Sequence, residues 1–342
     1  MKVLFLQSAH YADDDRVWYH QRAALSEAGC EVDVCGKEEL QDEGRLATIT
    51  NQADEYQVII VDTPRALWHV RRAKHAKLIY DITEWYPSKK NLRGLCLPHK
   101  WAKAFLMCLA SLWAGVRADA FIFGEYYKAL PFRMLFPHKQ HIYLPYYPDL
   151  QYIESFPPHN ITHQCRLLYA GPLTEEKGYY RVLEAVQEAQ RQCPNTHICL
   201  DIITNTPHQT HQTTKVEVNY LPYMPFNTFC KAIDQYDLFL DLRDCDCENT
   251  HCLPIKLFYY LACGRPCIYT NLKAIRNHVL EYNACISLAN TATEAANAIV
   301  EYIQMPSIYY AHCQKAQELS RQQYNWNCIK SNFIQLVARH RK

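Results

Sequence analysis

Two lysines stand where an apolar segment is followed by the expected start of a helix. In LLYAGPLTEEKGYYRVLEAV, residues 167–186, an apolar strand leads through a Gly/Pro/Thr turn into an amphipathic helix that begins near Lys177. The unpaired amides of a helix start carry partial positive charge, so a cation there is unfavourable by a few tenths of a kcal/mol up to about 1 kcal/mol. A bound anion would offset this repulsion.

The second lysine lies in NTHCLPIKLFYYLACGRPCIYT. Pro254 suits the first helical position, Gly264 suits a left-handed C-terminal cap, and Pro266 prevents the helix from continuing. Residues 255–263 are therefore predicted to form a short helix with Lys256 in its first turn. Two such helix starts in one domain are consistent with a shared diphosphate held by amides and ammonium groups. The alternative is that both lysines simply reach solvent.

The elements that must position these lysines follow a regular alternation of short apolar strands and longer amphipathic helices, which is typical of parallel βαβ units. In the first half, strands are predicted at 3–7, 30–36, 56–64 and 77–83, and helices at 16–29 and 65–77. In the second half, strands are predicted at 165–171, 196–204, 237–242 and 266–270, and helices at 177–193, 226–236 and 255–263. The Pro- and Tyr-rich segment at 146–162 between the two series indicates an interdomain connection.

Length and charge limit the function classes. The chain has 342 residues and a formal net charge of +1, from 36 Lys and Arg against 35 Asp and Glu. The length suits two domains, and the near-neutral charge gives no general basis for binding nucleic acid. The run VLFL near the N-terminus is too short for the central region of a signal peptide, so we expect a cytoplasmic protein. The G-x-G-x-x-G and G-x-x-x-x-G-K-S/T motifs for nucleotides are absent from the sequence.

The 16 cysteines are scattered through apolar segments of a large chain, so they are expected to be reduced and mostly buried. The densest region, DCDCENTHC, offers Cys245, Cys247, His251 and Cys252 as zinc ligands. Its spacing differs from the paired knuckles of structural zinc sites, so no metal is expected.

The blocks at 167–186 and 254–270 resemble the two signature blocks of the retaining glycosyltransferases of family four, which have the GT-B fold of two facing Rossmann-like domains. The family's first block reads roughly Gly-Arg-Leu, a few residues, Lys-Gly and a helix, and here it is Gly171-Pro172-Leu173 and Lys177-Gly178. The second block reads roughly Pro-x-Lys-Leu-x-Glu-Tyr-x-Ala-x-Gly-x-Pro, and here it is PIKLFYYLACGRP.

Agreement with this family extends to the rest of the chain. The opening HYADDDRVWYHQRAALSEAGCEVDVCG is similar to the family's first loop and helix, with Asp15 and Arg16 in an Asp-Arg-Val triplet. YDITEWYPSK at 80–89 resembles the active-site loop of the N-terminal domain, and YNWN at 324–327 resembles the start of a closing helix. The resemblance thus implies an acceptor-binding domain at 1–155, a nucleotide-sugar-binding domain at 156–325 and a closing helix at 326–342.

By this resemblance, the chain would move a sugar from a nucleotide-diphosphate sugar to a saccharide or lipid-linked saccharide, in the synthesis of a bacterial cell-surface polysaccharide or glycan. Transfer would occur between the domains with retention of configuration, and no metal or other cofactor is required. Gly171, Lys177 and Lys256 would hold the donor, and Asp15 and Arg16 would belong to the acceptor-side loop.

The sequence departs from the family on the donor side. The Glu that holds the donor ribose falls at Tyr259, whose phenol offers one hydrogen bond in place of a bidentate carboxylate. An earlier partner Glu aligns with His251, with Glu248 nearby on the same loop, and Pro172 replaces a common Arg. These departures keep open an alternative function, a non-catalytic relative that binds a nucleotide sugar or partners an active enzyme.

The active-site loop of the first domain also departs from the family, because the His of many relatives is Thr83, flanked by Asp81 and Glu84. Either carboxylate could orient an acceptor hydroxyl or act as a base, and we favour Glu84. The alternative for each is a structural acid at a strand end.

The most apolar stretch, WAKAFLMCLASLWAGV at 101–116, falls short of the roughly 20 residues needed to span a bilayer. Before it come basic residues, at Lys89, Lys90, Arg93, His99 and Lys100. Together they could rest on anionic lipid, as would suit a lipid-linked acceptor and peripheral membrane contact. The alternative, which we favour from the sequence, is a buried helix with a solvated basic approach.

Overall fold

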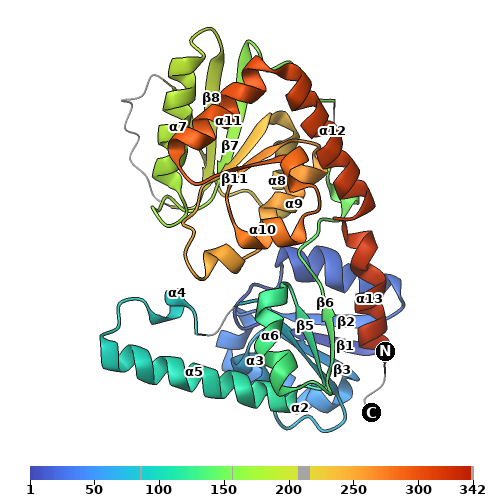
Figure 1. The fold of residues 1–342 in the computed structure, drawn as a ribbon. Helices are drawn as coiled ribbons and strands as arrows, with labels where there is room; N and C mark the ends of the chain where they lie inside the picture. Colours follow the sequence, from blue (N-terminus) through green and yellow to red (C-terminus); the bar gives the residue numbers. More distant parts are fainter. Residues whose placement is uncertain (85–86, 156, 207–215, 340–342) are drawn as a thin grey trace. The chain divides into compact units, whose positions relative to one another are not determined.

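The computed structural model describes residues 1–342 apart from 85–86, 156, 207–215 and 340–342. The chain divides into two compact units, the first formed by Met1–Tyr146 with Ile329–Lys342 and the second by Tyr147–Cys328. Within the described residues, each unit is built on one six-stranded sheet in which all paired strands are parallel (Figure 1). The predicted α/β class with two parallel sheets is confirmed.

The sheet of the first unit has the strand order β2-β1-β3-β4-β5-β6. Its strands are β1 (Lys2–Leu6), β2 (Glu31–Cys35), β3 (Val58–Val61), β4 (Lys77–Ile82), β5 (Ala120–Phe123) and β6 (Gln140–Tyr143). The central strands β3 and β4 are buried along their whole length, as expected for a parallel sheet covered on both faces. The order reverses between β1 and β3, which makes the carboxyl ends of these two strands a topological switch point.

The helices of the first unit include an unusual first one, because residues Arg16–Arg22 form a π-helix, η1, that continues into α1 (Ala23–Glu27). The others are η2 (Glu39–Gln41), α2 (Glu43–Gln52), η3 (Ala53–Glu55), α3 (Pro64–His69), α4 (Lys89–Leu92), α5 (Leu97–Arg117) and α6 (Tyr126–Leu135). The helix predicted over 65–77 is shorter than expected, because α3 ends at His69. Beyond its end, the backbone amide of Lys74 donates to the Asp54 carboxylate at 2.8 Å, so this segment is bound to the residues before β3.

The second unit repeats the architecture with the strand order β12-β11-β10-β7-β8-β9. Its strands are β7 (Gln164–Ala170), β8 (His197–Thr204), β9 (Glu217–Pro222), β10 (Leu238–Asp241), β11 (Cys267–Thr270) and β12 (Ile286–Ala289). Its helices are η4 (Leu150–Tyr152), α7 (Tyr179–Gln192), α8 (Phe226–Ala232), η5 (Ile233–Gln235), η6 (Asn249–His251), α9 (Ile255–Ala262), α10 (Lys273–His278), η7 (Tyr282–Ala284), α11 (Ala292–Gln304) and α12 (Pro306–Gln322). The switch point of this sheet lies between β7 and β10.

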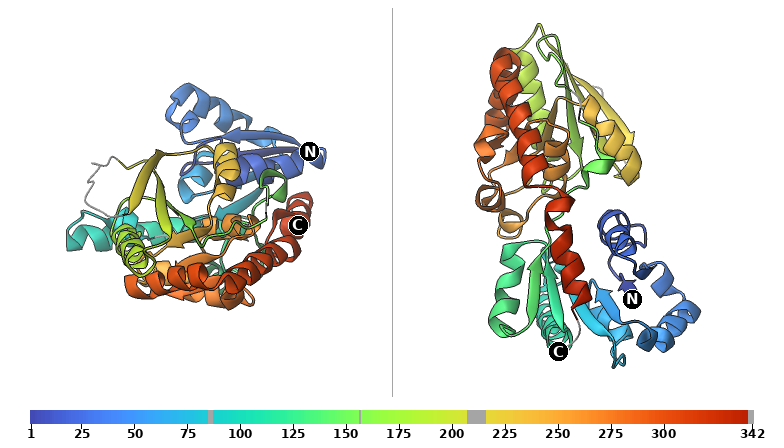
Figure 2. Two further views of the ribbon diagram at one scale, coloured as in Figure 1. Left: turned by 90° about the horizontal axis from the view of Figure 1, so that it is seen from above. Right: turned by 90° about the vertical axis from the view of Figure 1, so that its right-hand side faces the viewer.

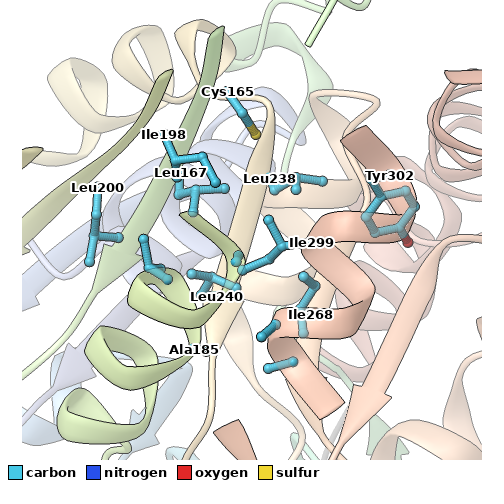
Figure 3. Close-up of a cluster of buried hydrophobic side chains, with 14 of the residues drawn as sticks. Cys165, Leu167, Ala185, Ile198, Leu200, Leu238, Leu240, Ile268, Ile299 and Tyr302 are labelled. Carbon is cyan, nitrogen blue, oxygen red and sulfur yellow. The ribbon is translucent and has the colours of Figure 1, made fainter. Parts of the chain in front are cut away.

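The core of the second unit shows why its sequence forms these layers (Figure 3). Inward side chains of the strands, among them Leu167, Leu200 and Leu238, meet the apolar stripe of α7 and the side chains of α11. The stripe of α7 consists of Val182, Ala185, Val186 and Ala189, at the spacing of one helix face, and all four are buried. Their small volumes let the helix lie close to the sheet.

The last helix, α13 (Trp326–Ala338), begins in the second unit and ends in the first. In the first unit it buries Phe333, Leu336 and Val337. The buried amine of Lys77, on β4, donates to the carbonyls of Leu336 and Arg339 at 2.5 and 2.8 Å, and so caps the C-terminal end of the helix. Burial lowers the pKa of Lys77. The resemblance predicted such a closing helix, and the predicted C-terminal helix is confirmed.

Candidate functional site

The carboxyl edge of the second sheet is organised by the loop between β7 and α7, which starts at Gly171. At Gly178 the backbone is left-handed, with φ of +77°, and an added Cβ would lie 2.0 Å from the carbonyl oxygen of Leu242. The hydroxyl of Tyr169 donates to the carbonyls of Pro172 and Lys177, at 2.7 and 3.2 Å. The loop is therefore held by the hydrogen bonds of Tyr169 and by the close packing of Gly178 against the end of β10.

Lys177 lies two residues before the helix rather than in it, because α7 begins at Tyr179. Its backbone amide donates to the hydroxyl of Thr174 at 3.3 Å. Its ammonium group pairs with Glu176 at 3.1 Å, and about a third of the side chain is exposed, 34%. The positive charge is thus presented at the switch point of the sheet by an ordered turn.

Lys256 comes from a different part of the sequence to the same edge. It is the second residue of α9, and its Nζ donates at 2.9 Å to the carbonyl of Ala170, the residue before Gly171. Pro254 precedes the helix in an extended conformation instead of occupying its first turn, whereas Gly264 has the predicted left-handed conformation, with φ of +69°. The two lysine-bearing blocks therefore meet at the end of β7.

A third cation at this edge, Arg243, was not found from the sequence. It follows β10, and its Nε donates to the Asp241 carboxylate at 2.8 Å. Burial alone would lower the pKa of Arg243, but the charge and hydrogen bonds of Asp241 raise it. The position of Arg243, directly after the predicted strand at 237–242, was the available signal.

The three remaining donor-side candidates are placed in two environments. His251 ends the short helix η6 and Glu248 directly precedes it, and the amide of His251 donates to the carbonyl of Glu248 at 3.3 Å. Tyr259 is in α9 and is buried, 7% exposed, with its ring edge-on to Phe226 of α8 at 6.0 Å. The phenol at the family's ribose-binding position is therefore part of the packed interior.

The carboxyl edge of the first sheet gathers polar side chains from the loops after β1, β3 and β4. His10 is central to this group, since its Nδ1 lies 3.2 Å from the Asp14 carboxylate and its Nε2 lies 3.5 Å from the hydroxyl of Thr83. Asp62, after β3, is buried and accepts the amides of Ser8 and Ala9 at 2.9 and 2.8 Å. The loop that carries His10 is thus anchored at the switch point.

The carboxylates around His10 change its acid–base behaviour. Burial alone would lower the pKa of His10, but the hydrogen bond and charge of Asp14, with the charges of Asp62 and Glu84, raise it. Burial would raise the pKa of Asp14, but its hydrogen bond to His10, the charge of His10 and that of Arg16 lower it. The pair therefore favours an imidazolium beside a carboxylate.

Neither His10 nor Asp14 was singled out from the sequence. The available signal was a histidine followed four residues later by an aspartate, both directly after the first predicted strand.

Arg16 and Asp81 form a buried pair below this edge. Their Nη1 and Oδ2 atoms are 2.7 Å apart, and their side chains are 6% and 2% exposed. The guanidinium also lies over the Tyr146 ring, 4.4 Å from its centroid, and Gln21 donates to Asp81 at 3.2 Å. Burial would lower the pKa of Arg16, but Asp81 raises it. Asp81 is therefore held in the interior by Arg16 and Gln21.

The other residues of the two predicted acceptor-side loops lie nearer the surface. Asp15 is exposed, and its carbonyl oxygen is 3.0 Å from Nδ1 of His20. Thr83 and Glu84 are half-buried after β4, and the carbonyl of Thr83 accepts from Lys128 at 2.6 Å. Trp85 and Tyr86 of the same motif lie outside the described residues.

The cysteine-rich segment at 244–252 has no chelating geometry in the described residues, among which no group of three or more His, Cys, Asp or Glu side chains could hold a metal ion. All 16 cysteines are free in the structure, and nine of them are buried.

Comparisons with known proteins agree with this architecture. Residues 164–305 match the family model described as Glycosyl transferases group 1. No curated protein sequence matches the chain.

Among solved structures, HepE of Anabaena in complex with UDP and glucose is similar, with a TM-score of 0.73 and 15% identity over 99% of each chain. The same protein in complex with UDP-glucose has a TM-score of 0.71 and 14% identity over 99% of each chain. Sucrose-phosphate synthase from Thermosynechococcus elongatus has a TM-score of 0.69 and 13% identity over 98% of each chain. The chain therefore has the GT-B fold, and its residues 164–305 are similar to the glycosyl transferases of group 1.

Proposed function

We propose that this protein transfers a sugar from a nucleotide-diphosphate sugar to a saccharide or lipid-linked saccharide, with retention of configuration and without a metal. The observation that carries the proposal is the convergence of Lys256, Gly171 and the Lys177 turn at the switch point of the domain that matches glycosyltransferases of group 1. Anabaena HepE has been solved with UDP-glucose, so UDP-sugars are the first donors to test. The product would belong to a bacterial cell-surface polysaccharide or glycan made at the cytoplasmic side.

On the donor side, we assign the diphosphate to Lys177, Lys256 and the turn that begins at Gly171. The leaving nucleoside diphosphate gains negative charge as the glycosidic bond breaks, so fixed cations stabilise the transition state more than the ground state. Glu176 would release Lys177 to the phosphate. Glu248, His251 and Tyr259 are assigned to the nucleoside end, where His251 and Tyr259 offer an imidazole and a hydroxyl at the two positions that carry Glu in the family.

On the acceptor side, we assign the contact with the acceptor hydroxyl to His10, Thr83 and Glu84. Asp14 would orient the His10 ring through Nδ1, leaving Nε2 for the acceptor hydroxyl. Asp81 is engaged by Arg16, so we assign both to positioning the loop that also carries Asp15. Glu84 remains the favoured carboxylate base.

The donor assignment is tested by thermal melting of the wild type and Lys177→Ala with UDP-, GDP-, ADP- and CMP-linked sugars. Ligand at about 100 times its dissociation constant adds roughly 2.7 kcal/mol, enough to raise the melting temperature by several degrees. We expect one nucleotide class to stabilise the wild type and the control Lys231→Ala, an exposed lysine of α8, but not Lys177→Ala. A large fall in the unliganded melting temperature of Lys177→Ala would instead make Lys177 a structural residue.

A second candidate function is favoured by residue 259, where Tyr replaces the ribose-binding Glu and its ring is buried against Phe226. In that case the protein would bind a nucleotide sugar, or partner an active enzyme, without transferring the sugar. A time course distinguishes transfer from binding alone. The protein is mixed with the donor that stabilises it and with an acceptor extract, and release of the free nucleotide is measured. Stabilisation without release would favour the non-catalytic function.

A further inference from the structure

Helix α5 carries an apolar stripe that the fold of its own unit does not cover. Of its residues, all of which the structure describes, Ala114 and Gly115 near its C-terminal end are the buried ones. The sequence-based preference for a buried helix is therefore wrong. In Figures 1 and 2 the N-terminal part of α5 extends away from the sheet of its unit.

The stripe is large and continuous. Six exposed side chains recur at intervals of three or four residues, which places them on one face of the helix. They are Leu97, Trp101, Phe105, Leu109, Leu112 and Val116, and we call this set the α5 stripe; their exposed fractions run from 42% at Leu112 to 73% at Trp101. A contiguous apolar patch of this kind marks an interaction surface.

The charge around the α5 stripe has one sign. The segment 88–117 contains no Asp or Glu, although acidic and basic residues are balanced over the whole chain. Arg93 and Lys100 are exposed beside the start of the helix, and Lys103 lies on its flank, where it donates to the carbonyl of Asn91 at 2.6 Å. The side chains of Lys89 and Lys90 are not among those described.

We propose that the α5 stripe docks on an anionic lipid surface. A helix with Trp, Phe and Leu on one face and cations beside it lies in the plane of the bilayer interface, with its apolar face below the headgroups. The headgroup charge then attracts the flanking cations. No helix in the described part of the chain is long and apolar enough to cross a membrane, which agrees with lying on the surface. A second copy of the chain fits less well, because pairing two such helices would bring like charges together.

The proposal does not rest on the transfer reaction, since the stripe belongs to neither assigned site. Flotation of the purified full chain tests it, with vesicles of neutral phosphatidylcholine and vesicles that also contain phosphatidylglycerol. We expect the protein to float with the anionic vesicles at low salt, to float much less with neutral ones, and to be released as salt is raised.

Two pairs of variants sharpen the test. Trp101→Ser/Phe105→Ser should weaken binding to anionic vesicles at least tenfold, whereas Leu280→Ser/Met305→Ser, which removes two exposed apolar side chains of the second unit, should leave it unchanged. Arg93→Gln/Lys100→Gln should weaken binding about fivefold per charge, and Lys231→Gln/Lys273→Gln is the matched control. Since these side chains are exposed, circular dichroism and melting temperature should match the wild type.

Three outcomes would overturn the proposal. If Trp101→Ser/Phe105→Ser binds anionic vesicles as tightly as the wild type, the contact lies elsewhere on the protein. If the wild type binds neutral and anionic vesicles equally, charge has no role in the binding. Absence of binding to every vesicle, with a dimer in sedimentation that Trp101→Ser/Phe105→Ser dissolves, would identify the partner as a second copy.

Discussion

The carboxyl edges of the two sheets share a topology and differ in charge. At the second edge, between β7 and β10, the side chains that converge are cations, namely Lys177, Lys256 and Arg243. At the first edge, between β1 and β3, His10 is surrounded by carboxylates. The same doubly wound frame thus carries cationic side chains at one edge and a histidine among carboxylates at the other.

The two edges also differ in how their charges are balanced. The cations of the second edge contact exposed or half-buried groups, namely Glu176, the Ala170 carbonyl and Asp241. Below the first edge, Arg16 and Asp81 are paired in the interior, with Arg16 Nε and Asp81 Oδ1 lacking a hydrogen-bond partner among the described residues. Removing a charge should therefore affect binding at the second edge and stability below the first.

The largest effect is expected for Asp81→Ala, which leaves the Arg16 guanidinium buried without its partner. Unfolding free energy, from urea denaturation, should fall by about 3–5 kcal/mol. The double variant Arg16→Met/Asp81→Leu should recover much of this loss, since it removes both charges. A double variant as unstable as the single one would show that packing, and not charge, dominates here.

The next effect concerns the loop at the second edge. Gly178→Ala must place a Cβ against the Leu242 carbonyl, so we expect a loss of roughly 2–4 kcal/mol in unfolding free energy. Gly29→Ala in the first unit has a similar φ of +80° but nothing within 4 Å of the added Cβ, so it should lose only about 1 kcal/mol. Equal losses would mean that backbone strain alone sets the cost.

A smaller effect should separate the edges functionally. By the proposed donor assignment, Lys256→Ala would remove one charged hydrogen bond to the phosphates, worth about 1.5–3 kcal/mol. We therefore expect donor affinity, measured by calorimetry, to fall roughly ten- to a hundredfold. His10→Gln should leave donor affinity unchanged and slow turnover. A loss of donor affinity in His10→Gln would contradict the assignment of His10 to the acceptor.

The smallest effect is a pH dependence of stability. A raised pKa of His10 contributes stability that is complete below its unfolded value of 6.5 and is lost as the pH rises through the folded value. The lowered pKa of Asp14 contributes stability that is present above its unfolded value of 3.8 and is lost as the pH falls. The difference in unfolding free energy between wild type and His10→Gln should therefore be largest near pH 5, at about 1 kcal/mol or less. A flat difference in urea titrations from pH 4 to 8 would show that the pair is uncoupled, and Asp14→Asn is the matched variant.

Sequence periodicity predicted the long strands and the α7 helix because their apolar residues repeat over several turns or alternate without interruption. It missed β5, and it also missed the edge strands β6, β9 and β12, whose many partly buried or exposed residues give a weak apolar pattern. It placed Lys177 inside a helix that begins at Tyr179. The lysine blocks were found because Gly and Pro mark their boundaries. His10 and Arg243 were missed because their importance comes from neighbours distant in sequence.

The contrast between α7 and α5 has the same origin. Both have an apolar stripe at helical spacing, but α7 covers its stripe with the sheet while most of α5 does not. Periodicity reports that a face is apolar, whereas only tertiary structure reports what covers it.

The capping of α13 by Lys77 makes the first unit discontinuous in sequence. A fragment that ends at residue 146 would lack Phe333 and Leu336, and the Lys77 amine would lose the carbonyls that it binds in the interior. Synthesis must therefore reach the last residues before the first unit can complete its core. During synthesis, the first residues of the first unit are therefore made before the second unit, and its remaining residues are made after it.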